Sequence, residues 1–203
     1  MKVNNKTRIL VQFSLLLALQ IILGVTPLGL IMVPPVAITL LHIPVIICGI
    51  TMGPLFGGLL GASFGLISLT KAITSAVSPI DLLFNPLVSG NAVASVIMCL
   101  VPRILLGVFA ALLFKLMKRL VKRNLLSIGI AAALATALHT IMVLGCLFLF
   151  FSAIPLMTVF GSVITLNGGL EITAAILVAA PVCNALLRYT GNGAKTAPAT
   201  TAP

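Results

Sequence analysis

Polar side chains that could bind a ligand are rare in this sequence, and several of them lie inside long apolar runs. Arg103 follows Pro102 in one run, and His139 is midway along another. Asn167 and Glu171 are four residues apart in a third run, a spacing that places both on one face of a helix. An ionisable group at membrane depth costs about 2.5–3.5 kcal/mol on insertion scales and usually faces a cavity or a partner. These residues predict either an outward-facing polar pocket or a purely structural pair between Arg103 and Glu171.

Two histidines in apolar runs leave the same choice open. His42 lies near the start of one run, and His139 has Thr136 and Thr140 nearby. Each imidazole could line the pocket, or it could be satisfied by a neighbouring backbone carbonyl.

Enzyme chemistry has little support in the residue types present. The chain has two acidic residues, Asp81 and Glu171, and they do not form the pair of carboxylates that acid–base catalysis needs. The sequence contains no HExxH, GxSxG or Walker-type phosphate-binding motif, so we expect no catalytic residues and no cofactor in this chain. The four cysteines are isolated within apolar runs and read as small core residues rather than as metal ligands or disulfides: Cys48, Cys99, Cys146 and Cys183.

The composition is that of a membrane protein. Of 203 residues, 61% are hydrophobic and 7% are charged, which leaves too few charges to coat a soluble globule. The formal net charge of +10 would suggest nucleic acid as a partner in a soluble protein. Here the basic residues cluster between apolar runs, so the charge indicates membrane topology and no nucleic-acid partner.

The apolar runs predict an all-α membrane protein with six transmembrane helices. A span takes about 20 residues. We expect helices over residues 9–25, 36–52, 54–70, 92–117, 125–151 and 166–188. A tight turn at Gly53-Pro54 should separate the second helix from the third, because proline disfavours helix at the residue before it and one helix of 35 residues would overshoot the bilayer.

Basic residues set the expected orientation. With six spans and a cytoplasmic N-terminus, ten of the twelve Lys and Arg residues fall on the inner side, and the C-terminus is also inside. Lys71 and Arg103 are the two that do not. We therefore expect one domain over residues 1–189, with outer loops at 26–35, 75–91 and 152–165, and a disordered tail over residues 190–203.

Small residues recur on two of the expected helices. Glycines at positions 49, 53, 57, 61 and 65 are spaced every four residues, which allows close backbone approach in lipid and suggests either tight packing or a sliding surface. Ser14 and Ala18 form a small-xxx-small pair on the first helix, which is weak evidence by itself.

Three motifs give the chain a family resemblance. The segment LHIPVIICGITMGPLFGGLLGASFGLISL (41–69), the segment VPRILLG (101–107) and the segment NGGLE (167–171) resemble, in this order, the substrate-binding S components of energy-coupling factor (ECF) vitamin transporters. The likeness covers roughly residues 8–188 and is greatest to S components of the pantothenate type.

The resemblance implies a six-helix, N-in and C-in S-component bundle in the bacterial plasma membrane, which captures a vitamin from outside and topples in the membrane to release it inward. Its partners would be membrane lipid, a transmembrane coupling protein (the T component) and two cytosolic ATPases, which use ATP and Mg²⁺. In the family, an AxxxA pair on the first helix contacts the coupling protein. The matching positions here are Ser14 and Ala18.

If the ligand is pantothenate, its carboxylate needs a cation and its hydroxyls and amide need polar groups. We expect Arg103 to bind the carboxylate and Asn167, Asn91 and His139 to bind the hydroxyls and amide. Glu171 would orient Arg103. Riboflavin or cobalamin as the vitamin, and a structural or assembly role for a small membrane protein, remain open alternatives.

Overall fold

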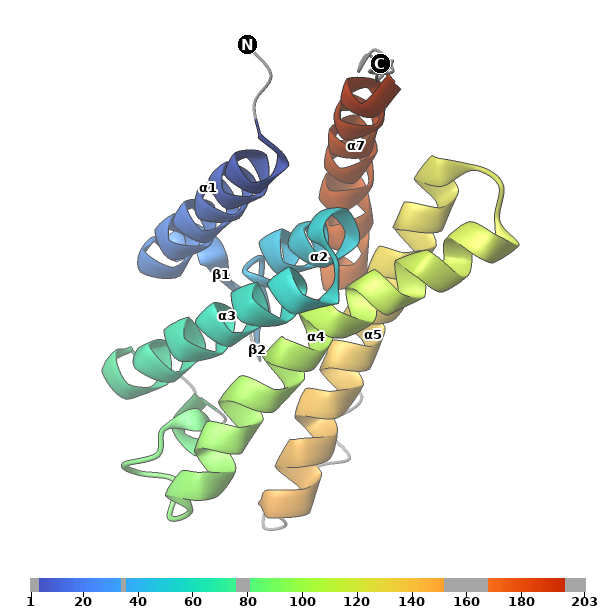
Figure 1. The fold of residues 1–203 in the computed structure, drawn as a ribbon. Coiled ribbons are helices and arrows are strands. Elements are labelled where there is room, and N and C mark those ends of the chain that lie inside the picture. The colour runs from blue at the N-terminus through green and yellow to red at the C-terminus, as the bar shows by residue number, and fades with distance from the viewer. Residues whose placement is uncertain (1–3, 34–35, 76–80, 152–167, 196–203) are drawn as a thin grey trace.

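The computed structural model of the chain describes residues 4–33, 36–75, 81–151 and 168–195, which form a helical bundle with one small β-hairpin (Figure 1). The α-helices are α1 (Asn5–Val25), α2 (His42–Met52), α3 (Pro54–Thr74), α4 (Ala92–Leu120), α5 (Asn124–Phe150) and α7 (Gly168–Lys195). The shorter elements are the 3-10 helices η1 (Pro27–Gly29) and η2 (Asp81–Phe84) and the strands β1 (Leu30–Val33) and β2 (Val36–Thr39).

Five of the predicted spans are confirmed as helices long and apolar enough to cross a membrane: α1, α3, α4, α5 and α7. The last of these continues to Lys195, into the segment for which the sequence predicts disorder. The expected tail beyond residue 195, the loop at 152–165 and Asn167 lie outside the described residues.

The second predicted span is wrong in its first part. Residues 36–39 form β2, which pairs antiparallel with β1 from Leu30 opposite Thr39 to Val33 opposite Val36. The all-α prediction therefore needs this hairpin as a correction. Val36, Ile38 and Thr39 are β-branched and favour an extended backbone, and the hairpin satisfies the backbone groups that a helix would otherwise pair.

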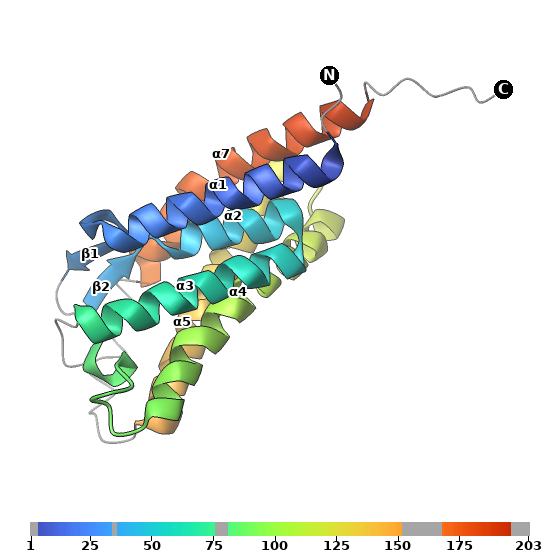
Figure 2. The same cartoon turned by 60° about the vertical axis from the view of Figure 1, so that its left-hand side comes forward.

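Helix α2 is short because it is enclosed. Its 11 residues span about 16 Å, about half of the 30 Å hydrocarbon core. Figure 2 shows α2 among α1, α3 and α7, and all residues from Leu41 to Ile50 are buried. A helix that is surrounded by other helices does not have to match the thickness of the bilayer.

The predicted turn at Gly53-Pro54 is confirmed. Gly53 ends α2 and precedes α3 with a φ of 94°, a region that L-residues with a side chain rarely adopt. Pro54 occupies the first position of α3, where its missing N–H costs no helical hydrogen bond.

The glycine row brings α2 and α3 onto α4. A Cβ on Gly57 would lie 2.6 Å from the carbonyl oxygen of Gly107, and a Cβ on Gly65 would lie 2.8 Å from that of Cys99. A Cβ on Gly61 would overlap the carbonyl of Arg103. These backbones therefore touch without intervening side chains, so the row except Gly53 serves tight packing and fixes the part of α4 that carries Arg103.

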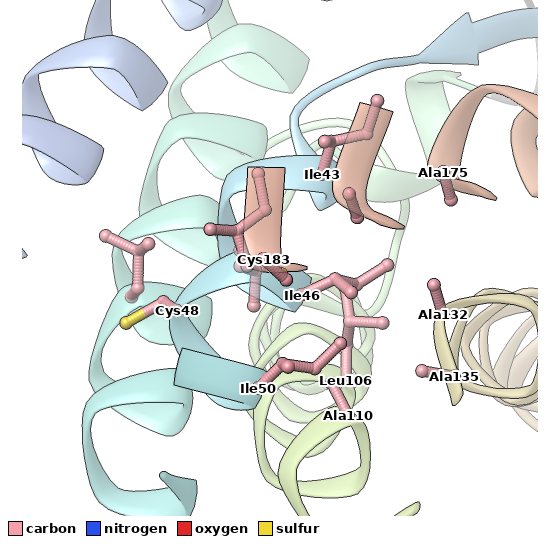
Figure 3. Packing of buried hydrophobic residues seen from close by; sticks show 14 of the residues in the cluster. Ile43, Ile46, Cys48, Ile50, Leu106, Ala110, Ala132, Ala135, Ala175 and Cys183 are labelled. Atoms are coloured by element: carbon pink, nitrogen blue, oxygen red, sulfur yellow. The ribbon is translucent and has the colours of Figure 1, made fainter. Parts of the chain in front are cut away.

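The apolar core lies between α2 and the helices around it. Figure 3 shows Ile46 and Ile50 of α2 facing Leu106 of α4, with Ala132 and Ala135 of α5 nearby. Cys48, Cys99 and Cys183 are buried free thiols, and Cys146 is half-buried and also free. The reading of the cysteines as core residues is thus consistent with their burial.

Candidate polar binding site

The position of the Arg103 side chain depends on Pro102, the residue before it. Pro102 lies inside α4 and has no N–H, so the carbonyl of Met98, four residues earlier, loses its helical partner. The guanidinium Nη1 of Arg103 donates to this same carbonyl at 2.6 Å. The carbonyl that Pro102 leaves without a helical partner thus accepts a hydrogen bond from the buried guanidinium of Arg103.

Two aromatic rings hold the other parts of this guanidinium. The Arg103 Cζ lies 5.5 Å from the ring centroid of Phe64 on α3 and 5.4 Å from that of Phe84 in η2. Both distances are within the range of cation–π attraction. Arg103 is only 8% exposed and its Nε has no hydrogen-bond partner. A fixed, buried cation therefore has a donor left for a ligand.

Glu171 lies near the start of α7 and ties the β-hairpin to the bundle. Its Oε1 accepts a hydrogen bond of 2.8 Å from the backbone N–H of Thr39 in β2. Glu171 is buried and close enough to Arg103 to interact electrostatically with it, but Arg103 donates to Met98 rather than to this carboxylate. The two residues attract each other without forming a closed ion pair.

His42 begins α2 and contacts the same hairpin residue. Its Nδ1 lies 2.7 Å from the carbonyl oxygen of Thr39, which can only accept, so Nδ1 carries a proton. In the neutral imidazole Nε2 is then an acceptor, and this atom is buried and has no partner. The carbonyl of Thr39 thus satisfies one ring nitrogen of His42, and the backbone of Glu171 is also close enough to act on the ring.

His139 on α5 completes the group. Its ring centroid lies 6.0 Å from that of Phe64, and it interacts electrostatically with Arg103 and His42. Its Nε2 is buried without a partner. Thr136 and Thr140 bond to carbonyls of their own helix and leave this nitrogen unpaired.

The structure thus brings together three of the predicted site residues, Arg103, His139 and Glu171, with His42 beside them. Asn91 makes no described contact with this group. It is exposed at the start of α4, and its side chain caps that helix by accepting a hydrogen bond of 3.1 Å from the Ala94 N–H. Sequence reasoning missed Phe64, Phe84 and Thr39. No pattern distinguishes these two phenylalanines from the other eight, and Thr39 acts through its backbone.

The predicted coupling residues Ser14 and Ala18 are both exposed on α1, away from this site. Elsewhere α1 is attached by a polar contact, in which Ser63 of α3 donates to the Gln20 side-chain oxygen at 3.1 Å. The small pair is therefore available to another protein.

The arrangement leaves polar atoms available to a ligand. Leaving a buried polar atom unpaired costs about 1–3 kcal/mol, and three such atoms are gathered here: Arg103 Nε, His42 Nε2 and His139 Nε2. They offer a charge-assisted donor and imidazole nitrogens to one small molecule. An anionic ligand with hydroxyl or amide groups fits this set.

Comparison with known proteins agrees with this chemistry. A family model described as the substrate-specific component of ECF transporters matches residues 8–183. The pantothenic acid transporter PanT of Lactococcus lactis subsp. cremoris (strain MG1363) is 34% identical over 166 residues, which cover 78% of this chain and 82% of PanT.

Proposed function

The chain belongs to the family of substrate-specific components of ECF transporters, and on this basis we propose that it captures pantothenate outside the cell for import. It is a multi-pass membrane protein and a substrate-binding subunit rather than an enzyme. The relative named as a pantothenic acid transporter supports the choice of vitamin.

The observation that carries the proposal is the buried Arg103 with its unpaired Nε. Pantothenate has one carboxylate, which Arg103 binds by a charge-assisted hydrogen bond. His139 and His42 bind its hydroxyls and amide through their unpaired nitrogens. Asn167, which lies outside the described residues, is kept as a further ligand for the hydroxyls and amide, and Asn91 only if its cap to Ala94 opens.

Glu171 acts on the site through Arg103 and the hairpin rather than on the ligand. Its carboxylate would repel an anionic ligand at contact distance, and its Oε1 already accepts from Thr39. It therefore orients the guanidinium electrostatically and positions the hairpin beside the site.

The orientation in the membrane is N-in and C-in. Ten of twelve Lys and Arg residues then lie on the cytoplasmic side of the bacterial plasma membrane, as the positive-inside rule requires. The hairpin and Glu171 lie at the opposite, outer end, where the vitamin arrives.

The family of substrate-specific ECF components implies partners that drive transport. A transmembrane T component contacts Ser14 and Ala18 on α1, and two cytosolic ATPases hydrolyse ATP with Mg²⁺. The loaded subunit topples within the bilayer to release pantothenate inward.

The experiment that tests the ligand is titration calorimetry on the purified chain in detergent, with pantothenate, riboflavin and cobalamin as separate titrants. We expect saturable binding of pantothenate alone. Binding of riboflavin or cobalamin instead would assign a different vitamin.

Assembly is tested separately by co-expression with T component and ATPases and by affinity purification through this chain. We expect a complex with all three kinds of partner. An unliganded homo-oligomer that retains none of them would point to a structural role.

A further inference from the structure

A narrow apolar groove runs along α1, α2 and α7 on the face of the bundle away from α5. Its volume is about 430 Å³. Leu16, Leu19 and Leu23 of α1 form one wall, and Ile47 of α2 with Val178 and Val182 of α7 form the other. The three helices can be followed side by side in Figure 2. Since these helices cross a membrane or are enclosed by helices that do, the groove opens to lipid rather than to water.

The shape of the groove limits its occupant. Along α1 it extends from Gln12 to Leu23, about 16 Å at 1.5 Å per residue, which is about half of the hydrocarbon core. One leaflet supplies half of that core thickness, so an acyl chain of one leaflet matches the groove in length. The lining of the groove is almost wholly apolar, so a hydrocarbon chain suits it.

One end of the groove is basic. Gln12, Thr51 and Leu186 line this end, and Lys6 and Arg8 lie within two helical turns of Gln12 on α1. On α7 Arg188 follows Leu186 by two residues and is exposed, as Lys6 is. The two acidic residues of the chain are remote from this end: Glu171 begins the opposite end of α7, and Asp81 is in η2.

A contact between α1 and α7 closes the same end. The Arg8 Cζ lies 5.7 Å from the ring centroid of Tyr189, so the two helices meet there. Tyr189 is 69% exposed, and a tyrosine with one apolar and one polar edge is typical of the membrane–water interface. The basic end is therefore at headgroup depth, with the groove leading from it into the hydrocarbon.

We propose that this groove binds an anionic phospholipid, with one acyl chain between α1, α2 and α7 and its phosphate next to Lys6, Arg8 and Arg188. The site is separate from the pantothenate site and does not depend on which side of the membrane the basic end faces. It is also separate from the expected coupling face. With 3.6 residues per turn, Ser14 and Ala18 point well round α1 from the stripe Leu16, Leu19 and Leu23. Both can therefore be occupied at once.

Native mass spectrometry of the purified chain tests the headgroup. The probes are phosphatidylglycerol and phosphatidylcholine with identical acyl chains. We expect one phosphatidylglycerol per chain to be retained preferentially. The double variant Lys6→Ala/Arg188→Ala should weaken this retention about tenfold to thirtyfold, because two basic residues near the headgroup are lost. The matched control is Arg119→Ala/Lys122→Ala, which removes the same charges at exposed positions remote from the groove.

A second pair of variants tests the acyl chain. Val178→Phe fills the groove, whereas Leu177→Phe enlarges an exposed neighbour on α7 that does not line it. We expect the first to lose lipid retention and the second to keep it, with pantothenate affinity equal to wild type in both as evidence of folding.

Equal retention of the two lipids, or equal effects of both charge variants, would overturn the proposal. So would a chain that retains no lipid but forms dimers that Val178→Phe disrupts, since the groove would then be an interface between copies. Failure of pantothenate binding in the wild-type chain would contradict the proposed function and leave the lipid result standing.

Discussion

Arg103 illustrates how one residue pair can make a buried charge tolerable. Pro102 releases the carbonyl that Arg103 needs, and the faces of Phe64 and Phe84 provide electrostatic support on the guanidinium. Glu171 contributes attraction without closing a salt bridge. The cation is thus stabilised enough to remain buried, while its Nε stays free for an anion.

The planar shape of the Arg103 side chain should matter for ligand binding as well as its charge. Arg103→Lys keeps the charge but loses the planar guanidinium that bonds to Met98 and a ligand at once. We expect pantothenate affinity to fall about tenfold to a hundredfold, because about one charge-assisted hydrogen bond to the ligand is lost. Calorimetry measures it, and the exposed Arg119→Lys is the control. Unchanged affinity in Arg103→Lys would remove Arg103 from the site.

A second prediction separates the two roles of Glu171. Glu171→Gln keeps an oxygen that accepts from Thr39 N–H but removes the charge, and Glu171→Ala removes both. We expect hydrogen exchange at Thr39 to stay slow in Glu171→Gln and to speed up in Glu171→Ala. Pantothenate affinity should fall in both, because Arg103 loses its orienting charge. Fast exchange in both variants would show that the charge, not the hydrogen bond, holds the hairpin.

The site residues that could be predicted from sequence are those that are rare by type. Arg103, His139 and Glu171 stand out because an ionisable group in an apolar run has few structural explanations. Phe64 and Phe84 are not distinguishable by type among ten phenylalanines. An asparagine in an apolar chain can bind a ligand or cap a helix, and the sequence does not distinguish the two roles. The contact of Asn91 with Ala94 shows that it caps α4.

Where α3 crosses α4, neighbouring glycines differ in how much room a side chain would have. Gly57 meets the backbone of α4, where nothing can move aside cheaply. Its neighbour Gly58 is also buried, but a Cβ there would meet only side chains, Val108 at 3.4 Å and Ile104 at 3.8 Å, both at ordinary contact distance. Adjacent glycines on one helix thus serve as a test and its control.

We expect Gly57→Ala to destabilise the protein by about 1–3 kcal/mol, since overpacking forces the helices apart. Gly58→Ala should be neutral or should stabilise by up to about 1 kcal/mol, because alanine is the better helix former. Thermal unfolding of the purified variants measures both. A similar loss in Gly58→Ala would mean that the whole row, rather than the backbone crossing, requires glycine.

The elements that sequence predicts well are those that meet lipid. A long apolar run must be a helix there, because no other open segment satisfies its backbone. Residues 36–41 are equally apolar, but β2 contacts α7 and pairs with β1, so that constraint does not apply to them. Pairing of β2 with β1 satisfies the backbone of residues 36–39 instead. The pattern of apolar residues in one strand does not reveal which segment pairs with it.

The proposed toppling of the whole bundle requires its lipid-facing surface to be free of charge. Leu134 is 41% exposed near the middle of α5, and Leu126 is 53% exposed in its first turn. Leu134→Lys should reduce transport in proteoliposomes much more than pantothenate binding, because the ammonium group must move through hydrocarbon. Leu126→Lys, close to the basic residues between α4 and α5, is the control. Equal losses of binding and transport in Leu134→Lys would argue against rotation.

Coupling is tested on the exposed face of α1. Ala18→Trp places a large ring where close helix approach needs a small residue, so we expect loss of co-purification with the T component and unchanged pantothenate affinity. Leu112→Trp, at a 49% exposed position on α4, is the matched control. Retained assembly in Ala18→Trp would move the docking surface elsewhere.

The shortness of α2 also bears on how the polypeptide is made. Eleven residues are about half of what the translocon retains as a span, so this segment has no stable place in the bilayer when it first leaves the ribosome. We therefore expect α2 to insert together with α3, as a helical pair with Gly53 at its tip. Before α3 is made, α1 would have to anchor the nascent chain.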